Sequence, residues 1–113
     1  MASIDKVTIV SKRLNLHEEL EAVFPSGYRH NLYYQPPANI SLQYPCIEYS
    51  FDGVKKVYAD NRTYLKSYIF TGTVISKNVD DPIFDSLIEL EGFRIIRRAV
   101  VDGLYHLYFS ITY

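Results

Sequence analysis

The chain has 113 residues, of which 48% are hydrophobic and 22% are charged. This length predicts a single domain over residues 1–113, and this composition lies far from the disordered and membrane-spanning classes. The formal net charge is −1, so no overall positive charge attracts nucleic acid or an anionic membrane.

The aromatic residues and the single cysteine indicate more about the kind of protein. There are eleven tyrosines and six phenylalanines but no tryptophan. A tyrosine ring is apolar and its hydroxyl needs a partner, so this content favours half-buried strands and contact surfaces. Cys46 is the single cysteine, which rules out a disulfide within the chain. The first twenty residues carry charges every few positions and lack the apolar run of a signal peptide, so we expect folding in a cytoplasm.

The N-terminal third predicts helix followed by a short strand. One apolar set has helical spacing behind Ser3 as a possible N-cap: Ile4, Val7, Val10 and Leu14. A second set points to another side of the helix, so we expect a bend or restart near Asn15: Leu16, Leu20, Val23 and Phe24. Tyr28–Gln35 then predicts a strand near a sheet edge, stopped by Pro36 and Pro37.

The segment Tyr44–Lys77 reads as two long strands joined by a polar stretch. Ile47, Tyr49 and Phe51 alternate as one buried row, and Leu65–Ser76 is rich in β-branched and aromatic residues. The dipeptide Asp52-Gly53 favours a turn, after which Val54–Tyr58 would return as a short strand. The alternative is one long protruding hairpin arm.

The C-terminal third predicts a helix and a hairpin. Asp80 or Asp81 can cap a helix that runs from Pro82 to about Leu90 and is closed by Gly92. Its apolar face comprises Ile83, Phe84, Leu87, Ile88 and Leu90. Phe93–Val101 and Leu104–Tyr113 then pair around Asp102-Gly103. Together the elements predict an α+β fold: an antiparallel or mixed sheet of about four to six strands, packed against an N-terminal helix and a short second helix, with a protruding β-arm.

Catalytic and metal-binding patterns are missing from the sequence. His17, His30 and His106 are far apart and lack metal-site spacing, and Cys46 is best explained as a small buried hydrophobe. No phosphate-binding glycine loop, nucleophile elbow or dinucleotide motif occurs. We therefore expect no enzyme, no cofactor and no metal.

One basic cluster is present, formed by Arg94, Arg97 and Arg98. Because strand neighbours alternate, Arg94 and Arg98 share one face and Arg97 lies on the other, unless a bulge intervenes. The cluster is either a solvated strand partnered by acids or a contact for DNA or an acidic partner.

Several segments together resemble the small tail-terminator or tail-completion proteins, which join head and tail in long-tailed bacteriophages and prophages. The likeness covers Tyr33 to Tyr113 and comprises YPCIEY (44–49), YADNRTYLKS (58–67), YIFTGTVISKN (68–78), DPIFDSLIEL (81–90) and VDGLYHLYFSITY (101–113).

The resemblance implies a non-enzymatic virion protein, made in the cytoplasm of the host bacterium. It implies a homo-oligomeric ring, usually a hexamer, that caps the tail tube, ends its polymerisation and meets the head-tail connector and neck proteins. DNA would be met only as it passes through the lumen, and no membrane is involved. Our hypothesis is that the arm from Val54 to Tyr64 contacts the neighbouring subunit or the tube protein through Lys55, Lys56, Tyr58, Asp60, Asn61 and Arg62.

Two other classes remain open. One is another neck or connector component, including a head-completion protein that touches DNA. The other is a small cytoplasmic enzyme or regulator, for which the sign would be a deep pocket that gathers His30 or His106 with Glu48 and Cys46.

Overall fold

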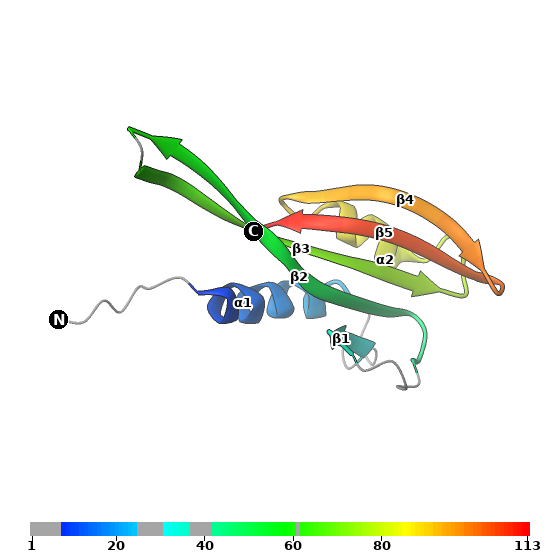
Figure 1. Ribbon diagram of the computed structural model, residues 1–113. Helices are drawn as coiled ribbons and strands as arrows, with labels where there is room; N and C mark the ends of the chain where they lie inside the picture. The colour runs from blue at the N-terminus through cyan, green and yellow to red at the C-terminus, as the bar shows by residue number, and fades with distance from the viewer. Residues whose placement is uncertain (1–7, 25–30, 37–41, 61) are drawn as a thin grey trace.

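The computed structural model describes residues 8–24, 31–36, 42–60 and 62–113, apart from the side chains of residues 59 and 62–65. These residues form two helices and five strands (Figure 1). The helices are α1 (Ile9–Ala22) and α2 (Pro82–Ile88), and the strands are β1 (Leu32–Tyr34), β2 (Cys46–Ala59), β3 (Arg62–Ser76), β4 (Phe93–Val101) and β5 (Leu104–Thr112).

The five strands form one mixed sheet in the order β1-β2-β3-β5-β4. All neighbours are antiparallel except β1, which runs parallel to β2. The predicted α+β class is therefore confirmed. The predicted strand Tyr28–Gln35 does lie at a sheet edge, but of its described residues only Leu32–Tyr34 form a strand, and residues 28–30 lie outside the described residues.

Helix α1 begins at a reciprocal cap. The Thr8 hydroxyl accepts a hydrogen bond from the Ser11 amide at 3.1 Å, and the Ser11 hydroxyl accepts one from the Thr8 amide at 2.9 Å. This arrangement satisfies two of the amides that a helix start leaves unpaired. The predicted cap, Ser3, lies outside the described residues, as do Ile4 and Val7.

The predicted bend near Asn15 is wrong, because α1 is continuous from Ile9 to Ala22. Leu16 and Leu20 are buried, whereas Val10 and Leu14 are 58% and 51% exposed. Only one stripe of a straight helix can face the sheet, and the stripe that buries its side chains is the second of the two apolar sets.

Both helices cover the same face of the sheet, and Figure 1 shows α2 behind β4 and β5. The two helices and the inner rows of the strands share one core. Its buried members are Leu16, Leu20, Phe24, Leu32, Ile47, Tyr49, Tyr68, Phe70, Val74, Ile83, Leu87, Leu107, Phe109 and Ile111. Within the described residues no helix covers the opposite face, which we call the open face.

Helix α2 starts as predicted. Asp81 is the N-cap and accepts a hydrogen bond from the Ile83 amide at 3.0 Å, and Pro82 occupies the first turn. The Ser76 hydroxyl donates to the other Asp81 oxygen at 2.7 Å, so the cap is tied to the end of β3. The helix ends at Ile88 rather than near Leu90, and Ile88 is exposed rather than part of the apolar face.

Two hairpins frame the sheet. The predicted turn at Asp102-Gly103 is confirmed, with φ angles of 53° and 76° that suit a tight hairpin turn. Asp52-Gly53 forms no turn, because β2 continues through it with a register shift between Phe51 and Gly53. Of the two alternatives for this region, the long hairpin arm is the correct one.

Candidate functional site

The arm consists of the parts of β2 and β3 that extend past the rest of the sheet. β1 pairs only with Ile47–Tyr49, and β5 pairs with β3 only from Ile69 onward. From Val54 to Lys66, therefore, the two strands pair with each other and with no other described strand. Figure 1 shows this ribbon projecting beyond the ends of β4 and β5 at the upper left.

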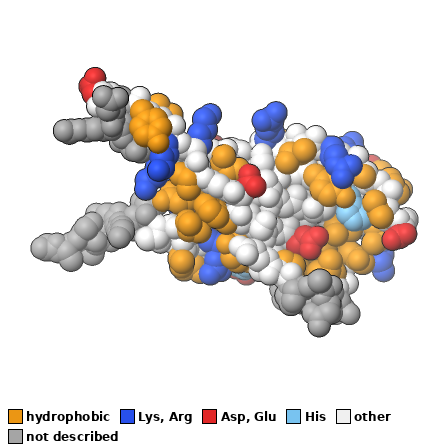
Figure 2. Space-filling model, in the orientation of Figure 1, with side chains coloured by type: hydrophobic (Ala, Val, Ile, Leu, Met, Phe, Trp, Pro, Cys, Tyr) orange, Lys and Arg blue, Asp and Glu red, His pale blue; other side chains and the backbone are white. Residues whose placement is uncertain are grey.

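The arm carries apolar side chains that its own fold does not bury. Tyr58 is 63% exposed, and Val54 and Val57 are exposed on the same strand. A two-stranded ribbon has no second layer to cover such side chains, so they remain free to contact another molecule. In Figure 2 hydrophobic and basic side chains lie together on the arm.

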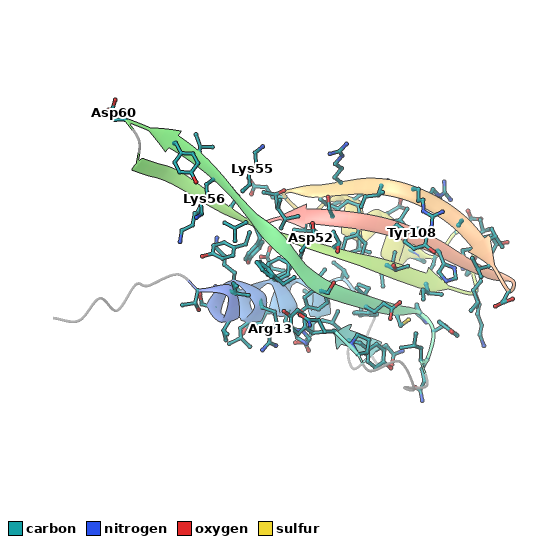
Figure 3. All side chains as sticks on the ribbon, in the orientation of Figure 1. Arg13, Asp52, Lys55, Lys56, Asp60 and Tyr108 are labelled. Carbon is teal, nitrogen blue, oxygen red and sulfur yellow. The ribbon has the colours of Figure 1, made fainter. Side chains whose placement is uncertain are left out.

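The hypothesised contact residues are spread along the arm. Lys55 and Lys56 are successive strand residues, so they point to opposite faces of the ribbon, as Figure 3 shows. Asp60 stands at the tip with a φ angle of 53°. Asn61 lies outside the described residues, and Arg62 is described only by its backbone, which pairs with Ala59.

These residues do not converge on one point, because the strand alternation divides them between two faces. A second register shift, between Val57 and Tyr58, changes the alternation again near the tip. Such an arrangement cannot surround a small ligand. It can present apolar area and positive charge to a macromolecular surface.

The open face of the sheet is a second candidate surface, which the sequence did not indicate. A hollow of about 680 Å³ extends over it and is lined by hydroxyl-bearing side chains with one acid, Glu48. The Arg97 guanidinium lies 4.3 Å from the centre of the Tyr108 ring in a cation–π contact. The hollow is wide and holds no paired nucleophile and base, so it suits a contact surface better than a reaction site.

The three arginines of the basic cluster do not take the faces that regular strand alternation predicts. β4 has a register shift between Ile95 and Arg97, with Ile96 as the additional residue. Arg94 and Arg97 consequently pair with Ser110 and Tyr108 and share the open face, whereas Arg98 pairs with Leu107 and faces α2.

The suggested nucleophilic site is not assembled in the described residues. Cys46 is fully buried, and burial, followed by the charge of Glu48, raises the pKa of its thiol to about 12. His106 lies two strands away, across β3, which is about 10 Å at ordinary strand spacing. His30 lies outside the described residues. A thiol in this state is neutral and inaccessible, unlike a catalytic cysteine.

A polar and aromatic cluster fastens α1 to the sheet. His17 Nδ1 and the Tyr49 hydroxyl share a hydrogen bond of 2.7 Å, and His17 Nε2 lies 3.9 Å from Glu21. The Arg13 guanidinium lies 4.8 Å from the centre of the Tyr34 ring. Burial raises the pKa of Tyr49 above its ordinary value, so its hydroxyl stays protonated. The cluster is an anchor for the helix rather than an acid–base site.

The described parts of the chain contain no group of three histidine, cysteine or acidic residues placed to hold a metal ion. No helix in those parts is long and apolar enough to cross a membrane.

No protein-family model matches this chain, and no curated protein sequence matches it.

Proposed function

We propose that this chain is a structural virion protein of a long-tailed bacteriophage or prophage, acting as a tail terminator at the head-tail junction. Copies of the chain form a ring, usually of six, that caps the tail tube and stops its polymerisation. The other side of the ring presents the surface that meets the connector and neck proteins. The protein is made in the host cytoplasm, and DNA passes through the lumen of the ring without a dedicated binding site.

The observation that carries this proposal is the arm. None of the arm residues whose side chains are described belongs to the buried core, yet the arm bears exposed Val57 and Tyr58 beside Lys55 and Lys56. Exposed apolar side chains that form a set with polar neighbours mark sites of protein association. The resemblance of its sequence, YADNRTYLKS, to tail-completion proteins supports the same role for the arm.

Ring formation needs two different surfaces on each subunit, because neighbours in a ring meet head to tail. The arm supplies one of them. The β4 edge of the sheet supplies a second surface, since β4 is an edge strand whose Ile96 and Val101 are exposed. In Figure 1 the arm projects at the upper left, whereas β4 runs along an edge of the sheet toward the right, so the two surfaces are different, as a heterologous contact requires.

Electron microscopy of the purified chain mixed with tail tubes tests this function. We expect rings in the free protein and rings seated on tube ends. The matched comparison is Val57→Ser with Tyr58→Ser, which removes apolar area from the arm, against Val10→Ser with Leu14→Ser, which removes exposed apolar area from α1, outside both surfaces. The arm variant should lose the rings and the α1 variant should keep them. A protein that stays monomeric and leaves tube ends bare contradicts the proposal.

A second candidate is another neck or head-completion protein. It is favoured by Arg94 and Arg97, which the bulge at Ile96 brings to the same open face, where they can meet an acidic partner or DNA. Binding to the isolated connector without binding to the tube would select this candidate.

A further inference from the structure

A groove between α2 and β4 has the chemistry to receive the arm. It measures about 260 Å³, and five of its nine lining side chains are apolar. The apolar side chains lining it are Val79, Phe84, Ile88, Ile95 and Leu107. Val79, Ile88 and Ile95 are exposed although they adjoin the core, so the groove offers apolar area that the chain leaves uncovered.

The rim of this groove is acidic. Asp80, Asp81 and Asp85 line it, against the single base Arg98. Both oxygens of Asp81 are used within the chain, by the Ile83 amide and the Ser76 hydroxyl. Asp80 and Asp85 are exposed, and in the described structure no ion pair joins either of them to Arg98.

The arm is complementary to the groove in both respects. It carries Lys55, Lys56 and Lys66, all exposed, together with the apolar side chains of Val57 and Tyr58. Lys56 pairs directly with Lys66, and Tyr58 lies two residues beyond Lys56, so these three side chains share one face of the arm. Their two ammonium groups can meet the acidic rim while the Tyr58 ring enters the groove. Complementary charge of this kind orients two surfaces and speeds their encounter.

The arm cannot fill the groove of its own chain. Tyr58 pairs with Thr63, and the groove residue Leu107 pairs with Val74, eleven residues along the same strand. At about 3.3 Å per residue this separation is roughly 35 Å, and the arm points away from α2 (Figure 1). The occupant therefore belongs to another molecule.

We propose that the arm of one copy docks in the α2–β4 groove of the next copy, and that this contact is the repeating interface of the ring. The inference rests on the proposed function, since it names the surface that the arm meets. Each copy offers one arm and one groove, so the contact is heterologous and closes into a ring when the rotation per subunit allows.

A charge-exchange experiment on the full chain tests this pairing. The arm variant is Lys56→Glu with Lys66→Glu, which reverses both charges on one face of the arm, and the groove variant is Asp80→Lys with Asp85→Lys. Each variant alone places like charges across every contact, so we expect each to remain monomeric in sedimentation velocity at concentrations where the wild type assembles. Mixed in equal amounts, the reversed arm meets the reversed groove and the native arm meets the native groove. The mixture should therefore form rings in which the two variants alternate.

Matched controls carry the same changes of charge elsewhere. Lys77→Glu with Arg94→Glu controls the arm variant, and Glu18→Lys with Glu48→Lys controls the groove variant. Both controls should assemble as the wild type does. Urea unfolding of all four variants separates a lost interface from a lost fold.

The outcomes distinguish the inference from the function on which it rests. If either variant alone forms rings, or if the mixture stays monomeric, the arm-in-groove contact is wrong. The proposed function still stands in that case, provided that the wild-type chain forms rings. A groove variant that forms rings but no longer seats on tail tubes also overturns the arm-in-groove contact, because the groove then belongs to the tube protein. A wild-type chain that never assembles, with or without tubes, contradicts the proposed function itself.

Discussion

The hydroxyl of Tyr49 lies 2.7 Å from Nδ1 of His17, and this hydrogen bond joins the second strand of the sheet to α1. Tyr49 is only 2% exposed, and its ring packs against Tyr34 and Phe70 at centroid distances of 5.0 Å and 6.2 Å. The residue therefore holds the helix through its polar tip and the core through its ring.

Tyr49→Phe should lower the free energy of unfolding by about 1 kcal/mol, because the ring stays but the hydrogen bond to His17 is lost. Urea unfolding measures the change. Tyr108→Phe is the control, since Tyr108 meets Arg97 through its ring, which phenylalanine retains. Equal stability of Tyr49→Phe and the wild type would show that the contact does not hold the helix.

Gly72→Ala should destabilise the chain by about 1–3 kcal/mol, the usual range for overpacking a core. A Cβ at this central strand position would lie 2.6 Å from the Glu48 carbonyl oxygen and 2.7 Å from Cζ of Phe109. Gly53→Ala is the matched control, because a Cβ there meets nothing within 4 Å. Thermal unfolding of the two variants compares them directly, and similar losses in both would contradict the close packing at Gly72.

The stability of the chain should fall in alkaline solution because of Cys46. Its pKa is raised to about 12 from 9.0, so the folded chain keeps a proton that the unfolded chain releases. The resulting stabilisation is complete below about pH 9 and is lost as the pH rises through about 12. One such group changes the free energy of unfolding by at most about 1.4 kcal/mol per pH unit.

Comparison with Cys46→Ala isolates this effect. That variant leaves a small cavity, which costs the same at every pH, but it has no thiol to titrate. The difference in free energy of unfolding between wild type and variant should shrink between about pH 9 and about pH 11. A constant difference would mean that the thiol is not protected by burial. Under native conditions at neutral pH the thiol should also resist a soluble disulfide reagent.

Removing apolar area from the arm should change assembly without changing stability. Val57→Ser with Tyr58→Ser affects side chains that the chain itself leaves exposed, so we expect the free energy of unfolding to stay within about 0.5 kcal/mol of the wild type. The same variant should assemble at least tenfold less tightly in sedimentation equilibrium, which corresponds to a loss of about 1.4 kcal/mol. A large loss of stability with unchanged assembly would assign the arm to the fold instead.

Local chemistry made much of the fold predictable. The Asp102-Gly103 turn and the Asp81-Pro82 helix start each depend on a few adjacent residues, and both occur as expected. The last strand alternates regularly, so Leu107, Phe109 and Ile111 share one face, and all three are buried.

Inserted residues and competing apolar faces were not predictable in the same way. The additional residue at Ile96 moves Arg97 to the face of Arg94, and a count of alternating positions cannot reveal such an insertion. The arm ran through Asp52-Gly53 because a bulge there let the strand continue. In α1, spacing alone could not select between the set of Val10 and the set of Leu16. The α2–β4 groove is formed by segments far apart in the sequence, so no sequence motif predicts it.

The mass of the full chain at increasing concentration, measured by native mass spectrometry, tests the central claim most directly. The account predicts a single closed species of fixed copy number, most simply six, that appears cooperatively and is lost in the Lys56→Glu, Lys66→Glu variant. A wild-type chain that stays monomeric at every concentration would contradict the account. An arm variant that forms the ring as readily as the wild type would contradict it as well.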